Sequence, residues 1–239
     1  TGCARKDIYI SDLAVEFWRD ARRPGAGKIN GFIAEIRGWQ TALLSADLSS
    51  ARGGFMSELE SVARRILSCT LCDLCRGRTH AVPGEGPENA RIMLIGEGPG
   101  AQEDLQGRPF VGASGQFMMD ALATVGVQRQ DVFITNLVKC RPPGNRDPLP
   151  DEILLCGATY LDLQIELIDP QIIITLGRFS LGRFLPQASI SRLHGQPQNV
   201  AGRLLYPLLH PAAALRRPEW RQAFQADVAR LPALLEDRR

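Results

Sequence analysis

Cysteine is the residue type in this sequence whose spacing points most directly to chemistry. The six cysteines are Cys3, Cys69, Cys72, Cys75, Cys140 and Cys156. Thiolates bind iron–sulfur clusters and tetrahedral zinc, and a CxxC pair in a reduced chain indicates metal or redox chemistry more often than a disulfide. Cys69 and Cys72 form such a pair, and Cys140 and Cys156, with 15 residues between them, can supply two further thiolates.

A second arrangement of the cysteines stays open. Cys75 extends the pair to a C-x2-C-x2-C run of the kind found in small ferredoxins, but Thr79 stands where the fourth cysteine of that pattern would fall. We therefore interpret Cys75 as a spare thiol. Taken alone, Cys156 is also explained as a buried cysteine on the apolar face of a helix.

Four further candidates stand where short apolar runs end. The glycines of segment 96–104 permit close backbone approach to a ligand, but G-x-G-x-x-G is not met and Pro99 lacks an N–H, which disfavours a phosphate loop. Phe110, between glycines, suits core filling or stacking on a base. Asn136 forms a turn or offers a donor and an acceptor to a base edge. His210, held by the following proline, is structural or catalytic.

Short buried strands alternating with helices must position these residues. The expected strands are 92–95, 132–135, 172–176 and 204–208, and the expected helices are 114–125, one along 153–167, 177–185 and 218–235. This alternation predicts a parallel sheet covered by helices on both faces. Because ligands of such sheets bind at the carboxyl ends of the strands, we expect the candidate loops to converge on one edge.

The chain divides at the helix that begins near residue 57. Ser57 followed by Glu60 fits a capping box, so we expect an N-terminal extension of unknown role over 1–55 and one domain over 56–239. No apolar run approaches the ~20 residues of a membrane helix, and no secretory signal opens the chain. We expect a cytoplasmic protein without membrane contact. The formal charge of +2 neither demands nor excludes nucleic acid.

Taken together, the motifs resemble the family 4 uracil-DNA glycosylases. The matching stretches, in order, are CTLC, GRT, GEGPGAQED, GRPFVG, ITNLVKCRPPGNR, PLPDE, IELIDPQIIITLG and HPAAAL. The resemblance implies a three-layer α/β/α fold with a central four-stranded parallel sheet, and a [4Fe–4S] cluster on Cys69, Cys72, Cys140 and Cys156. It also implies a monomeric repair enzyme that hydrolyses the N-glycosidic bond of uracil in single- or double-stranded DNA after rotating the base out of the stack.

The same resemblance assigns roles to the strand-end residues. Glu97 and Gly98 would form the uracil pocket with Phe110, which stacks on the base, and Asn136, which reads its pairing edge. The catalytic set would be His210 at the leaving uracil, with Glu103 and Asn145 as the polar residues around the attacking water. Leu215 and Arg216, after the histidine motif, are candidate DNA contacts, although a solvated helix surface explains the arginine equally well.

Three other functions fit parts of the sequence. An electron-transfer or redox-sensing protein would use the cluster itself, but has no use for the other motifs. A zinc-stabilised nucleic-acid-binding module would need no catalytic histidine. A uracil-DNA-crosslinking relative would carry a histidine in a basic insertion, whereas segment 141–146 has neither. We therefore favour turnover, and interpret His194 as structural or close to DNA.

Overall fold

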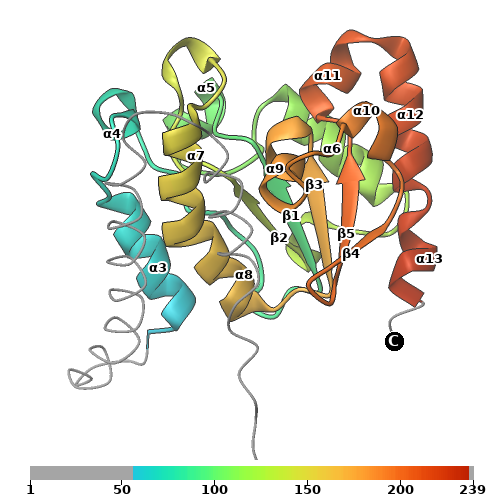
Figure 1. Ribbon diagram of the computed structural model, residues 1–239, viewed down its shortest axis with the longest axis horizontal. Coiled ribbons are helices and arrows are strands. Elements are labelled where there is room, and N and C mark those ends of the chain that lie inside the picture. Colours follow the sequence, from blue (N-terminus) through green and yellow to red (C-terminus); the bar gives the residue numbers. More distant parts are fainter. Residues whose placement is uncertain (1–55, 237–239) are drawn as a thin grey trace, which may run out of the picture.

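The computed structural model describes residues 56–236, so the extension expected over 1–55, with Cys3, lies outside the described residues. Its centre is a five-stranded sheet of order β2-β1-β3-β5-β4 (Figure 1). The strands are β1 (Ile92–Gly96), β2 (Val132–Asn136), β3 (Ile172–Leu176), β4 (Gln198–Val200) and β5 (Arg203–Leu208). β2, β1, β3 and β5 are parallel, whereas β4 is antiparallel to β5.

The sequence-based count of four strands was therefore one too low. β4 is short, and none of its three residues is buried. It pairs with β5 because Ala201 and Gly202, with φ of 50° and 80°, make a two-residue turn that folds the chain back on itself. Two consecutive residues with positive φ are typical of a type I′ hairpin. A polar edge strand of this length has no hydrophobic pattern that would have predicted it.

Alternate side chains of the central strands enter two separate cores. Ile92 and Leu94 of β1 point to one face, in a cluster with buried side chains of α6 (Ala113–Ala123), α11 (Pro211–Arg216) and α12 (Pro218–Val228). Met93 and Ile95 point to the opposite face, against α8 (Asp162–Ile168) and α9 (Arg178–Phe184). Each fully buried aliphatic side chain of this kind stabilises the fold by roughly 1.5–3 kcal/mol. Helices thus cover both faces of the sheet.

A third cluster attaches α3 (Glu58–Leu67) outside the sheet. The predicted capping box is confirmed, since the Ser57 side chain accepts from the Glu60 N–H and Glu60 reaches back to the Ser57 N–H. Val62 and Ile66 pack with Val138 beyond β2, and α3 lies along α8 (Figure 1). The remaining helical elements are α4 (Leu74–Gly77), α5 (Ala101–Gln106), η2 (Arg129–Asp131), η3 (Pro143–Asn145), α7 (Pro150–Cys156), η4 (Gly157–Leu161), α10 (Ile190–Leu193) and α13 (Leu231–Glu236).

Two expected helices differ in detail. The helix along 153–167 is present, but a π-helical turn over Gly157–Leu161 joins α7 to α8. The single final helix was wrong, because α12 ends at Val228 and α13 begins at Leu231. Pro232 explains the break, since a proline lacks the N–H that would bond the carbonyl four residues earlier. None of the helices in residues 56–236 is long and apolar enough to cross a membrane.

Candidate active site and cysteine centre

Gly96 ends β1 and allows two side chains to meet above it. A Cβ at this position would overlap Asn136 Oδ1 and would lie 2.5 Å from Phe110 Cζ. The strand register places Gly96 beside Asn136 at the end of β2. The sheet edge therefore brings the ring of Phe110 and the amide of Asn136 to one place, as expected for a site that stacks and reads a planar ligand.

Phe110 is held in a backbone conformation that its side chain disfavours. Its φ is 51°, in the left-handed region, which costs of order 1–3 kcal/mol and persists only where neighbours impose it. Glu103 Oε1 accepts from the N–H groups of Val111 at 2.9 Å and Gly112 at 2.8 Å. Arg129 Nη1 donates to the Phe110 carbonyl at 3.2 Å. These contacts fix the loop that presents the ring.

The side-chain amide of Asn136 is buried and has no hydrogen-bond partner among the described residues. The residue is 1% exposed, yet neither Oδ1 nor Nδ2 has a hydrogen-bond partner. Leaving a buried polar group unsatisfied costs about 1–3 kcal/mol per group, so such groups are rare in folded proteins and call for an explanation. A ligand that donates to one atom and accepts from the other would remove this cost.

His210 is positioned as the N-cap of α11. Its Nδ1 accepts from the Ala212 N–H at 3.2 Å, so the neutral ring carries its proton on Nε2. Burial, and then the charge of Arg216, lower the pKa of His210 to about 4. Gly177 directly follows β3, has a φ of 88° and lies beside His210. A Cβ on Gly177 would lie 3.0 Å from His210 Cβ. The imidazole is therefore neutral near pH 7 and fixed in one tautomer.

The three residues share one edge of the sheet. His210 follows β5, which is separated from β1 only by β3, and Asn136 ends β2 on the other side of β1. At a strand spacing of ~4.8 Å, β5 lies about 10 Å from β1, and Asn136 Oδ1 lies over Gly96 at the end of β1, so a bound base and its sugar can span from this amide to His210. Gly96 ends β1 and Gly177 follows β3, so neither position adds a side chain of its own at this edge.

Glu97 follows Gly96 and is partly buried at the same edge. Burial and then the nearby Asp147 carboxylate raise the pKa of Glu97 to about 7, opposed by Arg178. Arg178, at the start of α9, forms an ion pair with Asp147. A Cβ on Gly98 would lie 2.8 Å from Val138 Cγ2, so this loop packs directly against the segment that continues β2.

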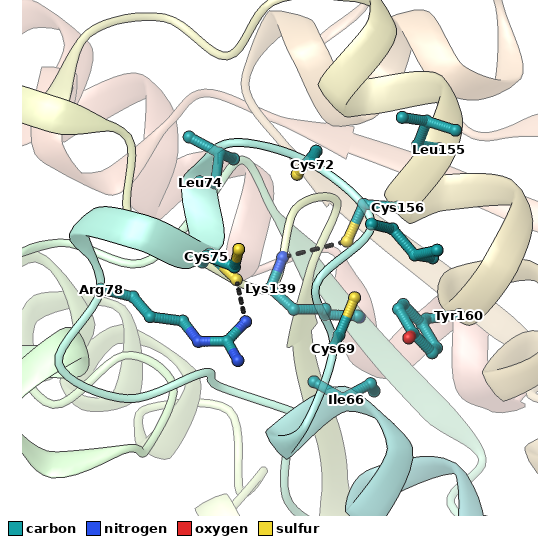
Figure 2. A pocket seen from close by; sticks show the side chains of 12 residues that line it. Ile66, Cys69, Cys72, Leu74, Cys75, Arg78, Lys139, Leu155, Cys156 and Tyr160 are labelled. Carbon is teal, nitrogen blue, oxygen red and sulfur yellow. Dashed lines mark hydrogen bonds between the residues drawn. The ribbon is translucent and has the colours of Figure 1, made fainter.

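The cysteines of the described residues line one pocket between α3, α4 and the start of η4 (Figure 2). Cys69, Cys72, Cys75, Cys140 and Cys156 all line it, and the sulfurs of the labelled cysteines turn toward the space between the segments (Figure 2). All five are free thiols. The two halves of the predicted ligand set, distant in sequence, are therefore brought together.

Two of these five sulfurs accept a hydrogen bond of defined geometry. Arg78 Nη1 donates to Cys140 Sγ at 3.1 Å, and the Lys139 N–H donates to Cys156 Sγ at 3.2 Å. Both of these cysteines belong to the four predicted ligands.

In the described part of the chain, no three His, Cys, Asp or Glu side chains are placed to hold one metal ion. Burial raises the pKa of Cys156 to about 12 and that of Cys72 to about 11. A thiol has to lose this proton to bind a metal or a cluster.

Comparison with known proteins identifies the family. Residues 83–231 match the model of the uracil DNA glycosylase superfamily. The chain belongs to this superfamily. It is 43% identical over 188 residues to a type-4 uracil-DNA glycosylase of Archaeoglobus fulgidus, covering 75% of this chain and 94% of the relative.

Other relatives place it within the type-4 branch. A type-4 uracil-DNA glycosylase of Saccharolobus solfataricus is 44% identical over 193 residues, covering 77% of this chain and 89% of the relative. A type-5 enzyme of Pyrobaculum aerophilum is 34% identical over 149 residues, covering 55% of this chain and 65% of the relative. The resemblance inferred from the motifs is confirmed.

Membership of the superfamily does not fix the role of each residue, and Glu103 is a case in point. It is 8% exposed, and its Oε2 accepts from the Gly100 N–H at 3.1 Å while Oε1 accepts from Val111 and Gly112. Both carboxylate oxygens are therefore engaged with backbone. These contacts hold two pocket loops together, and the role of Glu103 around the attacking water stays a prediction.

The other predicted residues of this superfamily member are exposed or half-buried. Asn145 is exposed, has a φ of 55°, and accepts from Arg141 Nε at 2.8 Å. Leu215 is half-buried and Arg216 is exposed at the end of α11. Within residues 56–236, none of these three residues forms a hydrogen bond with Phe110 or Asn136. Their roles stay predictions.

Sequence reasoning missed Lys139, whose side chain bonds the backbone of the pocket residue Asn136. It is 1% exposed, and its Nζ donates to the Asn136 carbonyl at 2.8 Å, to Thr135 Oγ1 at 2.5 Å and to Gln164 Oε1 at 2.7 Å. The signal was present, because Lys139 is one of only three lysines in the chain and stands between Asn136 and Cys140. A buried lysine at that place has to bond local carbonyl or hydroxyl oxygens.

The crowding above Gly96 gives a direct test of the pocket. Gly96→Ala is expected to leave the fold intact at a cost of about 1–3 kcal/mol, since an added methyl in a packed site is destabilising by this amount. It should weaken binding of free uracil and raise KM, because the Cβ separates Phe110 from Asn136. Uracil inhibition constants measured beside Gly182→Ala, where a Cβ in helix α9 meets nothing within 4 Å, check this. Equal effects of the two variants would contradict it.

Proposed function

We propose that this superfamily member hydrolyses the N-glycosidic bond of uracil in DNA. The observation that carries the proposal is the unpaired, buried amide of Asn136 beside the ring of Phe110, at the same sheet edge as His210. The relatives described above are uracil-DNA glycosylases by name. We assign residues 56–239 to a three-layer α/β/α glycosylase domain that acts as a monomer.

Uracil recognition follows from the atoms that Asn136 leaves free. Its Oδ1 accepts from uracil N3–H while its Nδ2 donates to O4, and Phe110 stacks on the ring. Cytosine presents an acceptor at N3 and a donor at C4, so both bonds would be lost and the amide would stay unpaired. The base reaches this pocket only when rotated out of the helix, which costs a few kcal/mol. Glu97 stands where it can exclude a methyl at C5.

His210 stabilises the leaving group. When the bond between C1′ of the sugar and N1 of uracil breaks, negative charge develops on the base and water adds at C1′. The neutral imidazole donates its Nε2–H to uracil O2, the tautomer that the Ala212 contact enforces. A donor fixed before the reaction typically lowers the barrier by ~3–4 kcal/mol in a dry site. Glu103 holds the loops around it, and we assign Asn145 to the polar residues around the attacking water and Leu215 and Arg216 to DNA contact.

Four thiolates hold the proposed [4Fe–4S] cluster. Cys69 and Cys72 follow α3, Cys140 follows β2, and Cys156 ends α7. A cluster bound there ties these three segments together by covalent iron–thiolate bonds, which is a structural contribution. Because Cys140 lies four residues after Asn136, the tie also secures the segment that presents the amide.

Uracil release is tested with a labelled oligonucleotide containing one uracil. After incubation, alkali cleaves at the abasic site, and single-stranded and paired substrates are compared. An oligonucleotide with cytosine at the same place is the control. A protein that shows a reversible redox couple but releases no uracil would instead favour the electron-transfer alternative, and a covalent protein–DNA product would favour the crosslinking one.

The raised pKa of Glu97 predicts a dependence of stability on pH. In the unfolded chain Glu97 ionises near its ordinary value, whereas in the folded protein it holds its proton up to a pKa of about 7. Between these values the folded state binds more protons, so stability falls as pH rises through 7. Glu97→Gln should therefore raise Tm at about pH 8 and flatten its decline from about pH 6. An unchanged slope in thermal melts of the variant would contradict the assignment.

A further inference from the structure

We infer that residues 78–80 and α5 couple the cysteine centre to the uracil pocket, with Asp104 as the positioning residue at the middle of the link. The inference rests on the proposed function and deepens it, because it assigns roles to residues that belong to neither site. It also gives a reason why a cluster at the flank of the molecule affects recognition at the sheet edge.

On the cluster side the link begins at Arg78. Its guanidinium spans two segments: Nη1 donates to Cys140 Sγ at 3.1 Å, a bond drawn as a dashed line in Figure 2, and Nη2 donates to the Leu67 carbonyl at 3.1 Å. Hydrogen bonds and charge at ligating sulfurs tune both the potential and the stability of iron–sulfur centres. The position of Arg78 therefore depends directly on the ligand sulfur it binds.

The next two residues are fixed by Asp104. Its Oδ1 accepts from the Thr79 N–H at 2.8 Å and the His80 N–H at 3.4 Å, and the Asp104 carbonyl lies 3.0 Å from His80 Nδ1. Asp104 is 4% exposed. A buried carboxylate bonded to backbone N–H groups is a charge-assisted anchor, so the segment after Arg78 cannot move without moving α5.

On the pocket side the link ends at Phe110. Glu103 precedes Asp104 in α5, a helix of six residues, and bonds the amides of Val111 and Gly112. These are the two residues that follow Phe110, whose left-handed φ needs external support. One short helix thus binds the cluster segment with one residue and the base-stacking loop with its neighbour.

Arg129 also holds the Phe110 carbonyl, so the coupling is partial. We therefore expect severalfold effects and not complete loss. Spatial continuity alone does not demonstrate coupling, which has to be measured as non-additivity between substitutions.

The experiment uses the iron-loaded protein and its Arg78→Gln, Asp104→Ala and double variants. Arg78→Gln should lower the reduction potential of the cluster and speed hydrogen exchange of the amides at 110–112 severalfold, with KM for uracil-DNA rising more than kcat falls. Asp104→Ala should speed the same amides and leave the potential unchanged. In the double variant, exchange at 110–112 should be no faster than in Asp104→Ala alone. Arg76→Gln is the matched control, since the Arg76 side chain is 82% exposed and forms its ion pair within the described part of the chain with Asp73 alone.

Independent, additive effects on exchange would overturn the inference, as would unchanged exchange at 110–112 in an Arg78→Gln protein with full iron content. If that variant does not accumulate, the same cycle is run with Arg78→Lys and Asp104→Asn, and the same two outcomes decide. Failure of the proposed cluster is distinguishable, because wild-type protein would then contain zinc or no metal before any exchange is measured.

Discussion

Replacing His210 by alanine is expected to lower the single-turnover rate of uracil release by about 10²–10³-fold, the loss typical of removing one preorganised donor. The expectation follows from three features of the structure. Nδ1 is occupied by the Ala212 N–H, burial holds the pKa of the ring at about 4, and Gly177 packs so closely beside the ring that a Cβ there would lie 3.3 Å from His210 Cδ2. Substrate binding should change much less than the rate, because the donor acts on charge that develops during bond cleavage.

The matched control is His194→Ala. His194 precedes His210 in the same C-terminal part of the chain, but its Nδ1 pairs with Asp227 Oδ2 at 2.7 Å. This substitution should lower stability and leave the single-turnover rate of the folded protein nearly unchanged. Glu103→Ala is the decisive comparison, since it should raise KM by loosening the pocket loops while costing less rate than His210→Ala. The reverse ranking would show that water activation, and not the leaving group, carries the catalysis.

The parallel strands and the edge that carries the site were predictable from the sequence. Each run of apolar residues is long enough for one buried strand, and chain direction alone then places Asn136 and His210 at the same edge. Likewise Ser57 and Glu60 specify the start of α3 through bonds between residues three apart. Local patterns were sufficient wherever the interaction is local or follows from sheet geometry.

What could not be predicted depends on contacts between distant segments. The hydrogen bonds of Glu103 to the amides of 111 and 112 could not be predicted, because no spacing rule brings these groups together. The hydrogen-bond donor to Cys140 Sγ is Arg78, 62 residues away in the sequence. The side-chain oxygen of Gln164 accepts from Lys139 Nζ and replaces part of the water that this buried ammonium group has lost. The residue types were visible, but their partners became known only with the fold.

Replacing Cys156 by alanine is expected to abolish iron binding and to prevent the domain from accumulating in a folded form, whereas Cys75→Ala should retain about four iron atoms per chain. Both thiols line the same pocket, but only Cys156 receives a hydrogen bond at sulfur, from the Lys139 N–H. In zinc-finger peptides, binding of the structural Zn²⁺ contributes about 10–16 kcal/mol, comparable to the whole stability of a domain at about 5–15 kcal/mol. Loss of one cluster ligand is therefore expected to unfold the domain, and the Cys72 and Cys140 thiols, whose pKa values are raised by burial, become neutral. Iron and sulfide content, absorbance near ~400 nm and thermal melts of the two variants provide the measurement. If Cys75→Ala lost its iron while Cys156→Ala kept it, the ligands would be those of the C-x2-C-x2-C run, and the cluster would no longer join α3 to α7.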